Sequence, residues 1–382
     1  MTTRFGHGLV VGKFYPPHLG HTYLIETAAR NCAGVTVLVM AAQCETLPLA
    51  DRLAWLRADL AGQPRVVIGG VRCDVPVDFD DPAVWEAQVA VMRAALERDQ
   101  RRSVDAVFSS EPYGRELAAR LGAEHVAVDP RRAAVPVSGS QIRADLAGCW
   151  DYLIPSARAG MAARVVVLGA ESTGTSTVAQ LLAGHYRSRG GVWGRTWCVT
   201  EAGRDYTAVK WRHARDAAAA AGKAEPPLEE LNWSAADFDA IAAEQTRREN
   251  QAVAGGSPLL VCDTDAFCTS VWERRYLAER ARGLRPWATT LLPHRDVYLL
   301  TSHDGVPWHD DGLREGDLAI RAAMTGWFAA ALTAAGHSWV LLTRGLQDRL
   351  ALAVRVTDYV LDHRLRFGQA IAEGVAGGGG CR

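Results

Sequence analysis

Near its N-terminus the chain reads Gly8-Leu9-Val10-Val11-Gly12-Lys13-Phe14-Tyr15-Pro16-Pro17-His18-Leu19-Gly20-His21. The first four of these residues form a short apolar run, which is typical of a buried strand. Apolar residues at Leu24, Ile25 and Ala28 follow at helical spacing, so we expect a strand, a turn and a helix that begins near Leu19. Such a turn exposes unpaired backbone N–H groups and the positive end of the helix dipole. The stretch therefore predicts a site for an anion.

Several residues of this turn are suited to contact such an anion. His18 and His21 lie three residues apart and would point the same way on the first turn of a helix. Gly20 between them leaves space for a ligand to approach the backbone, and Lys13 adds positive charge at the strand end. Taken singly, these features are ordinary, because two histidines at this spacing are more often surface or core residues and Pro-Pro is common in loops.

Outward from this turn, short β-branched apolar runs alternate with segments of helical periodicity. The strands are expected at Gly8–Val11, Val35–Met40, Arg65–Ile68 and Val104–Phe108, and helices at Leu53–Leu60 and Val84–Leu96. This alternation indicates βαβ units, because parallel strands need crossover connections. It predicts a doubly wound α/β domain, in which helices cover both faces of a parallel sheet.

The same pattern starts again at Arg164–Leu168, which leads into a glycine-rich turn and a helical stretch, Val178–Tyr186. Further strands are expected at Leu259–Cys262, Val297–Leu300 and Trp339–Leu342. A chain of 382 residues also exceeds the ~250–300 residues that one core usually organises. We therefore expect two doubly wound parallel-sheet α/β domains, residues 1–158 and 164–372. Residues 373–382 are expected to form a flexible tail, because consecutive glycines offer no side chains to pack.

Composition and charge exclude several classes of protein. Hydrophobic residues make up 48% of the chain and charged residues 22%, which is typical of a soluble globular protein. The net charge of −1 provides no general attraction to nucleic acid, and no apolar run approaches the ~20 residues that cross a bilayer. The start lacks a secretory signal, and the eight cysteines lack zinc or disulfide spacing. We expect a cytoplasmic protein that binds small molecules, and neither nucleic acid nor a membrane.

The order G-K-F-x-P-x-H-x-G-H over residues 12–21 resembles the signature of the HxGH nucleotidylyltransferase superfamily. A second motif of that superfamily, I-S-x-T-x-I-R, is similar to Val137-Ser138-Gly139-Ser140-Gln141-Ile142-Arg143. The departures, Val137 for Ile and Ser140 for Thr, keep the chemistry. We expect Ser138 to cap a helix start and Arg143, one turn into that helix, to bind phosphate oxygens with its fork of donors.

Residues 109–114 and 128–132 resemble segments of the nicotinamide-mononucleotide adenylyltransferase domain of NadR-type proteins. This resemblance implies that the phosphate of nicotinamide mononucleotide attacks the α-phosphorus of ATP, so that NAD forms and pyrophosphate leaves without a covalent intermediate. Positioning and charge stabilisation would carry the reaction, with Mg²⁺ bridging the phosphates. The catalytic residues would be His18, His21, Lys13 and Arg143, and the nucleotide would contact Gly12, Phe14, Gly20 and Ser138.

The glycine-rich turn of the second domain reads Gly169-Ala170-Glu171-Ser172-Thr173-Gly174-Thr175-Ser176. It fits the P-loop pattern G-x-x-x-x-G-K-[ST] except that Thr175 replaces the lysine. The glycines and amides that cradle phosphates remain and Ser176 can bind Mg²⁺, but the lysine that reaches the β- and γ-phosphates is missing. A chain this rich in arginine would favour arginine at that position, so composition does not explain the threonine.

The second domain resembles the ribosylnicotinamide kinase half of NadR-type proteins at residues 200–206, 262–265 and 307–314. The whole chain would then be a Rossmann-like nucleotidylyltransferase domain followed by a P-loop kinase-like domain that phosphorylates nicotinamide riboside. ATP would contact Gly169, Gly174, Thr175, Ser176, Thr177 and Arg314. Asp263 would orient Mg²⁺ together with Ser176.

Some roles in the second domain stay open. Either Glu201 or Asp265 is a candidate to accept the proton of the ribose 5′-hydroxyl. Arg204 and Arg314 are candidates to replace the missing lysine, although each is equally compatible with a solvated surface charge.

Alternative functions also stay open. Thr175 is compatible with an adenylyltransferase whose second domain is a catalytically impaired, nucleotide-binding regulatory domain. The HxGH motif reports phosphate handling, so a pantetheine or cytidyl-type reaction in the first domain is a further alternative. Some NadR-type proteins carry an N-terminal helix-turn-helix, but here a strand is expected within ten residues of Met1, so we expect none. The preference for nicotinamide or nicotinate, homo-oligomerisation and regulation are undetermined by the sequence.

Overall fold

The computed structural model describes residues 3–98, 103–283, 294–309 and 317–368. The chain divides into two compact units, one comprising Met1–Gly160 with Leu365–Arg382 and the other Met161–Arg364. This division differs from the expected domains at the C-terminal side, where the segment from Leu365 onward belongs to the first unit. Arg314 and the expected flexible tail, residues 373–382, lie outside the described residues.

The first unit is built on a five-stranded sheet with the order β3-β2-β1-β4-β5, in which all neighbours pair in parallel. Its strands are β1 (Phe5–Gly12), β2 (Cys32–Ala41), β3 (Val66–Arg72), β4 (Ala106–Ser109) and β5 (Glu124–Ala127). The strand order reverses between β1 and β4. In a doubly wound sheet a ligand crevice forms beyond the carboxyl ends of the strands at such a switch point.

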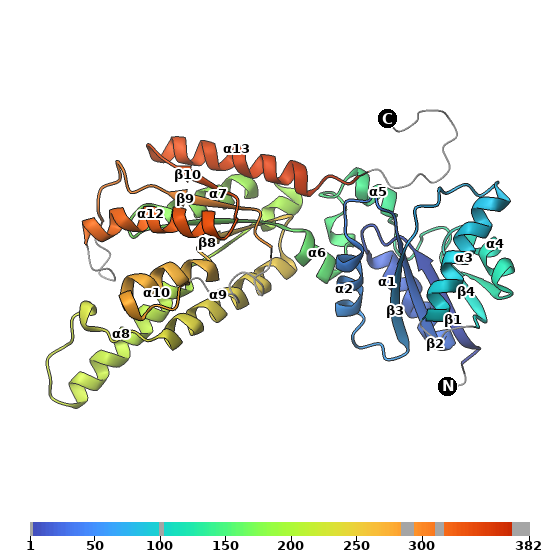
Figure 1. The fold of residues 1–382 in the computed structure, drawn as a ribbon, viewed down its shortest axis with the longest axis horizontal. Coiled ribbons are helices and arrows are strands. Elements are labelled where there is room, and N and C mark those ends of the chain that lie inside the picture. The colour runs from blue at the N-terminus through green and yellow to red at the C-terminus, as the bar shows by residue number, and fades with distance from the viewer. Residues whose placement is uncertain (1–2, 99–102, 284–293, 310–316, 369–382) are drawn as a thin grey trace. The chain divides into compact units, whose positions relative to one another are not determined.

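Helices cover both faces of the first sheet, and Figure 1 shows α1 and α2 on one side and α3 and α4 on the other. The helices are α1 (Leu19–Asn31), α2 (Leu49–Asp59), α3 (Pro82–Arg98), α4 (Tyr113–Leu121), α5 (Gly139–Ala144) and α6 (Pro155–Met161), with a 3₁₀ turn η1 (Trp150–Tyr152). Side chains of β1 alternate between two cores, Val10 packing with α1 and α2 and Leu9 and Val11 with α3 and α4. This alternation follows from the two-residue period of a strand.

The second unit also holds a five-stranded parallel sheet, with the order β10-β9-β6-β8-β7. Its strands are β6 (Ala163–Gly169), β7 (Trp197–Val199), β8 (Leu259–Asp263), β9 (Val297–Thr301) and β10 (Trp339–Leu342). The strand order reverses between β6 and β8, so the switch point of this sheet lies at the end of β6.

Helices again lie on both sides of the second sheet, with α7 and α13 on one side and α9, α10 and α12 on the other (Figure 1). The helices are α7 (Thr175–Arg187), α8 (Ala202–Ala220), α9 (Ala235–Gly255), α10 (Thr269–Leu277), α12 (Leu318–Ala334) and α13 (Leu346–Arg364). Four 3₁₀ turns join them: η2 (Gly191–Arg195), η3 (Leu228–Glu230), η4 (Ala266–Cys268) and η5 (Ala278–Arg280). Away from the sheet, α8, α9 and α10 enclose an apolar cluster that includes Trp233, Phe238 and Leu277.

Two doubly wound parallel-sheet α/β folds are therefore confirmed. The sequence did not predict β5 or β7, because β5 begins with the polar residues Glu124 and His125 and β7 has only three residues, so neither shows an apolar run of strand length. The cysteines of the described residues are free thiols, with Cys32, Cys262 and Cys268 buried and Cys44 exposed. No helix in the described part of the chain has both the length and the apolar character that a membrane crossing requires.

Candidate functional site

The turn between β1 and α1 holds His18 and His21 in a reciprocal cap at the start of α1. The Nδ1 atom of His18 accepts a hydrogen bond from the Gly20 backbone N–H at 3.1 Å, and Nδ1 of His21 accepts one from the His18 backbone N–H at 3.2 Å. The two rings stack with centroids 3.7 Å apart and 30° between their planes. Because both Nδ1 atoms accept, these hydrogen bonds assign the proton of each neutral ring to Nε2.

Burial and neighbouring cations keep both histidines neutral. Burial, together with the smaller effect of the charges of Arg132 and Arg143, lowers the pKa of His18 to about 3. The pKa of His21 is also held well below 6.5, first by burial and then by His18 and Arg132. The pair therefore offers neutral N–H donors, and the positive charge of the site comes from the arginines.

Gly20 makes room for a side chain of the protein itself. A Cβ atom at this position would lie 2.9 Å from Cε1 and 3.0 Å from Nδ1 of His18. The sequence suggested space for a ligand beside Gly20, whereas the structure fills that space with the imidazole of His18. The glycine is required because the His18 ring folds back over the helix start.

Lys13 and Phe14 follow directly after β1. Nζ of Lys13 lies 3.6 Å from Oε1 of Glu45, a buried carboxylate that also binds Arg52 at 2.6 Å. The Phe14 side chain is 1% exposed, has a φ of 48°, and lies against the His21 ring with centroids 4.5 Å apart. A nucleotide would therefore reach Phe14 through its backbone. Gly12 leaves room for this ring, since a Cβ there would lie 3.3 Å from Phe14 Cε2.

The second motif lies against the same turn. Ser138 is the N-cap of α5, as expected, and forms a capping box with Gln141. Nη1 of Arg143 donates to the Tyr15 carbonyl oxygen at 2.8 Å, and Nη2 donates to Ser140 Oγ at 3.0 Å. The structure thus brings Arg143 to Tyr15, in the turn that carries the histidine pair, across 128 residues of sequence.

Arg132 is a site residue that the sequence reasoning did not assign. Its guanidinium donates to the Val137 carbonyl oxygen at 2.9 Å and to the carboxylate of Glu111. Its charge lowers the pKa of both His18 and His21, so it lies near both rings. The signal was present, because Arg132 belongs to one of the segments that carried the family resemblance.

The segment that follows α13 lies against the loop after β2 and against Tyr15. The Tyr15 hydroxyl donates to the Gly368 carbonyl oxygen at 3.1 Å, and the Gly368 N–H donates to Thr46 Oγ1 at 3.0 Å. The Phe367 ring meets the Tyr15 ring edge to face, with centroids 5.3 Å apart. Tyr15 is therefore held by Arg143 through its carbonyl and by the C-terminal segment through its hydroxyl, and no sequence pattern predicted the second contact.

In the second unit, the P-loop joins β6 to α7. Gly174 has a φ of 85° and precedes the first helical residue, Thr175. A Cβ on Gly169 would lie 2.2 Å from Thr301 Oγ1 and 2.7 Å from Thr173 Oγ1. Both glycines are therefore required by the loop conformation, in agreement with a phosphate-binding turn.

Two buried arginines donate hydrogen bonds to backbone carbonyl oxygens of the P-loop. Arg321 donates to the carbonyl oxygens of Glu171 and Ser172 at 3.0 and 2.9 Å. Arg349 donates to the carbonyl oxygen of Thr173 at 2.8 Å. Since these carbonyls are bound by the arginines, the loop has its shape without a lysine at position 175. No sequence pattern indicated either arginine.

Ser176 and Thr177 lie in the first turn of α7, and Asp263 ends β8 with 5% of its surface exposed. Asp263 is paired in register with Val167 on β6, so it lies beside the strand that enters the P-loop. The described residues contain no cluster of three histidine, cysteine or acidic side chains suited to a metal. A hydroxyl and a carboxylate nevertheless fit Mg²⁺, which keeps several waters and takes further ligands from phosphates.

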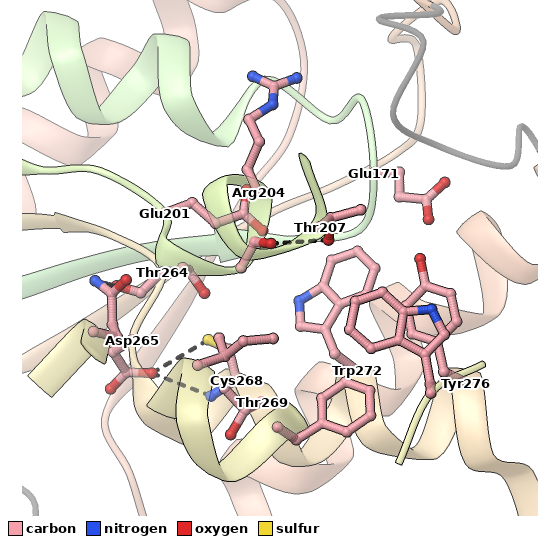
Figure 2. A pocket seen from close by; sticks show the side chains of 15 residues that line it. Glu171, Glu201, Arg204, Thr207, Thr264, Asp265, Cys268, Thr269, Trp272 and Tyr276 are labelled. Atoms are coloured by element: carbon pink, nitrogen blue, oxygen red, sulfur yellow. Dashed lines mark hydrogen bonds between the residues drawn. The ribbon is translucent and has the colours of Figure 1, made fainter. Parts of the chain in front are cut away.

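A pocket opens beside the P-loop, between aromatic and acidic side chains (Figure 2). Trp272 and Tyr276 of α10 lie side by side, with centroids 6.3 Å apart and 20° between the rings. Trp233 stacks on Tyr276 at 5.1 Å. Glu171 and Glu201 contribute carboxylates to the lining. The pocket can therefore hold a planar cationic ring together with a polyol.

The two candidate bases differ in their surroundings. Asp265 is 1% exposed, and its Oδ2 binds Arg295 at 3.0 Å and the Tyr298 hydroxyl at 2.9 Å. Glu201 is partly exposed and is the N-cap residue of α8 at the pocket. Both oxygens of Asp265 accept hydrogen bonds, with the Cys268 N–H binding the other, so this buried carboxylate is suited to a structural role.

Gln245 of α9 is a buried residue that sequence reasoning did not identify. Its Oε1 accepts from the Ala202 N–H at 2.9 Å, and its Nε2 donates to the Thr264 carbonyl oxygen at 3.4 Å. This one side chain thereby bridges the loops after β7 and β8, which carry Glu201 and Asp265. A glutamine within a helix has no sequence signature that would predict such a role.

A further ion pair connects the P-loop to α10. Oε1 of Glu171 lies 3.0 Å from Nη2 of Arg275, and both side chains are at most 2% exposed. Arg204, expected as a phosphate-binding cation, lines the pocket, but Figure 2 shows its guanidinium pointing away from the aromatic side chains and from Asp265.

Comparisons with known proteins agree with this geometry. A family model described as an AAA domain matches residues 164–349. The trifunctional NAD biosynthesis/regulator protein NadR of Salmonella typhimurium strain LT2 is 25% identical over 320 residues, which cover 80% of this chain and 71% of that protein. The Escherichia coli K12 protein of the same name is 26% identical over 327 residues, with the same coverage.

Two solved structures share the fold along nearly the whole chain. A crystal structure of NadR protein in complex with NR has a TM-score of 0.62 at 19% identity and covers 95% of this chain and 97% of its own. One in complex with NAD and AMP-PNP has a TM-score of 0.59 at 20% identity, covering 94% and 98%. Together these findings confirm the resemblance to NadR-type proteins.

Proposed function

We propose that this NadR-type chain is an enzyme of NAD synthesis whose first unit transfers AMP from ATP to nicotinamide mononucleotide and whose second unit phosphorylates nicotinamide riboside. The observation that carries the proposal is the stacked pair of His18 and His21 at the switch point of the first sheet, with Arg132 and Arg143 beside it. The names of the relatives, NAD biosynthesis/regulator proteins, support the substrate class.

In the first reaction, a phosphate oxygen of nicotinamide mononucleotide forms a bond to the α-phosphorus of ATP. The bond from that phosphorus to the bridging oxygen breaks, and pyrophosphate leaves. The Nε2–H groups of His18 and His21 donate hydrogen bonds to phosphate oxygens, and Arg132, Arg143 and Lys13 supply positive charge. The attacking phosphate is already an anion, so the reaction needs no general base.

In the second reaction, the pocket of the second unit binds nicotinamide riboside. The pyridinium ring of this substrate carries a positive charge, and the faces of Trp233, Trp272 and Tyr276 attract such a cation. Glu201 accepts a hydrogen bond and then the proton from the ribose 5′-hydroxyl. The pocket therefore matches both the ring and the hydroxyls of the substrate.

ATP binds the P-loop of the second unit through the amides at Gly169, Gly174 and Thr175 and the first turn of α7 with Ser176 and Thr177. Bound Mg²⁺ would neutralise phosphate charge there, held by Ser176 and by Asp263 directly or through water. Arg314, also a candidate for ATP binding, lies outside the described residues.

A second candidate function rests on Thr175, which stands where a P-loop lysine is expected. In this alternative the chain is an adenylyltransferase, and the second unit binds nucleotide without turnover and regulates the first. The intact P-loop conformation is compatible with both functions, because binding and catalysis use the same cradle of amides.

Three incubations of the purified chain with ATP and Mg²⁺ test these functions by chromatography of the products. With nicotinamide mononucleotide we expect NAD and pyrophosphate, and their absence would contradict the first reaction. With nicotinamide riboside we expect ADP and nicotinamide mononucleotide. ATP binding without these products would favour the regulatory alternative. Phosphopantetheine as the acceptor is the control for specificity and should give no adenylylated product.

A further inference from the structure

We propose that Arg275 of α10 brings to the terminal phosphate of ATP the positive charge that a P-loop lysine would otherwise supply. The inference rests on the proposed kinase function of the second unit. It starts from Thr175, which has no charge to offer at the position where P-loop proteins carry that lysine.

The place of Arg275 follows from its partner. Glu171 is the third residue of the P-loop, and its side chain also lines the pocket for the acceptor (Figure 2). Nη2 of Arg275 lies 3.0 Å from Oε1 of Glu171, and the two side chains are 2% and 1% exposed. Arg275 is therefore held at the junction between the phosphate cradle and the acceptor pocket, where the transferred group must pass.

Two other arginines near the loop bind its backbone. Arg321 and Arg349 donate to carbonyl oxygens of the P-loop backbone, and those hydrogen bonds maintain the shape of the loop. The guanidinium of Arg204 points away from the aromatic wall of the pocket (Figure 2). Arg275, in contrast, pairs with the side chain of a P-loop residue, Glu171.

The guanidinium can serve a carboxylate and a phosphate together. Its five N–H donors form a rigid fork, so one edge can keep Glu171 while other N–H groups turn to a phosphate oxygen. Glu171 then acts as a positioning residue, because it holds the guanidinium in place before ATP binds. Burial of the pair strengthens its attraction for a phosphate, since little water screens it.

The step itself is a single displacement. The 5′-hydroxyl oxygen forms a bond to the terminal phosphorus of ATP as the bond from that phosphorus to the β–γ bridging oxygen breaks. ADP leaves, and the hydroxyl proton passes to the Glu201 carboxylate. Arg275 gains and loses no proton; it stabilises negative charge on the oxygens of the group in transit.

The test uses the full chain, nicotinamide riboside and ATP–Mg²⁺, with four variants: Arg275→Met, Glu171→Gln, the double variant R275M/E171Q, and R275M with Thr175→Lys. We expect Arg275→Met to lower kcat by about 100-fold or more, as removal of a charge-stabilising donor does. Glu171→Gln should cost less than about tenfold, because the guanidinium remains. The double variant should stay as slow as R275M, and adding T175K should restore at least about tenfold.

Cooperative thermal unfolding of the second unit reports whether each variant is folded, and AMP transfer by the first unit, measured on the same preparations, should be unchanged throughout. Recovery of the wild-type rate in R275M/E171Q would overturn the inference, because Arg275 would then only neutralise buried Glu171. A normal rate in R275M would overturn it as well. If the wild-type chain itself forms no ADP, the proposed kinase function fails and the role of Arg275 fails with it. The two failures can be told apart: an inactive wild type contradicts the kinase function, whereas an active wild type with an equally active R275M contradicts only the role of Arg275.

Discussion

The imidazole of His18 stacks on that of His21 at 3.7 Å, and each ring uses Nδ1 to accept a backbone N–H at the start of α1. One pair of side chains thereby caps the start of a helix and leaves the Nε2 atom of each ring outside the capping hydrogen bonds. The cap uses Nδ1 of each ring, and the proposed phosphate contact uses Nε2–H. A substitution can therefore remove one of these interactions and keep the other.

Substitution of His18 tests this separation. His18→Ala loses both functions, so we expect NAD formation to fall by about 100-fold or more and the unit to lose about 1 kcal/mol of stability with its cap. His18→Asn provides a cap acceptor without the Nε2 donor, and it should lose activity while keeping the stability. Urea unfolding and the rate of NAD formation measure the two effects.

The matched control for His18 is His213→Asn, since His213 is exposed on α8 of the second unit. This variant should have the wild-type rate of NAD formation. A His18→Asn variant with an undiminished rate would remove the His18 Nε2–H from the mechanism.

The pKa of His18 predicts how stability depends on pH. Burial lowers this pKa to about 3 in the folded chain, against 6.5 when unfolded. Below pH 6.5 the unfolded chain therefore binds a proton that the folded chain rejects. The stabilisation is complete above pH 6.5 and is lost progressively as the pH falls toward 3.

Nuclear magnetic resonance of labelled histidines measures this directly. We expect His18 and His21 to stay as neutral Nε2–H tautomers from pH 7.5 down to 5. Unfolding experiments should also find a smaller loss of stability between these pH values in His18→Asn than in the wild type. A His18 ring that titrates near 6.5 would contradict the buried, capped arrangement.

Gly20→Ala tests whether the glycine serves the protein or the ligand. The new Cβ would lie 2.9 Å from Cε1 of His18, so the ring must move from its stacked position. We expect at least about a tenfold loss in NAD formation, because catalytic groups must be held within a fraction of an ångström. Gly62→Ala is the control, since a Cβ there meets nothing within 4 Å, and it should retain full activity.

Glu201 and Asp265 should respond differently to loss of charge. Glu201→Gln should lower nicotinamide riboside phosphorylation by about 100-fold or more without changing the free energy of unfolding. Asp265→Asn leaves buried Arg295 with less negative charge, so we expect a loss of about 3 kcal/mol of stability. Equal stability of the two variants would contradict the structural role assigned to Asp265.

Local patterns in the sequence were sufficient to predict both sheets. The runs at β1, β2, β6, β8 and β9 are apolar and β-branched because both faces of a parallel sheet are buried, and that burial is readable residue by residue. The cap at Ser138 and the helix start at Leu19 were also predicted, since capping depends on residues within one turn. The strands β5 and β7 were missed because the polar residues of β5 and the three-residue length of β7 leave no apolar run of strand length.

The candidate sites also have features that the sequence predicts and features that only the tertiary structure shows. The sequence by itself predicted which turns are suited to phosphate, because glycines, histidines and helix starts act over a few residues. Only the tertiary structure decided which distant side chains serve them: Arg143 at the Tyr15 carbonyl, Phe367 on the Tyr15 ring and Arg275 at Glu171. The physical reason is that such contacts depend on how the elements of the fold pack together. Residues that are distant in the sequence and meet through packing share no sequence pattern that would predict their contact.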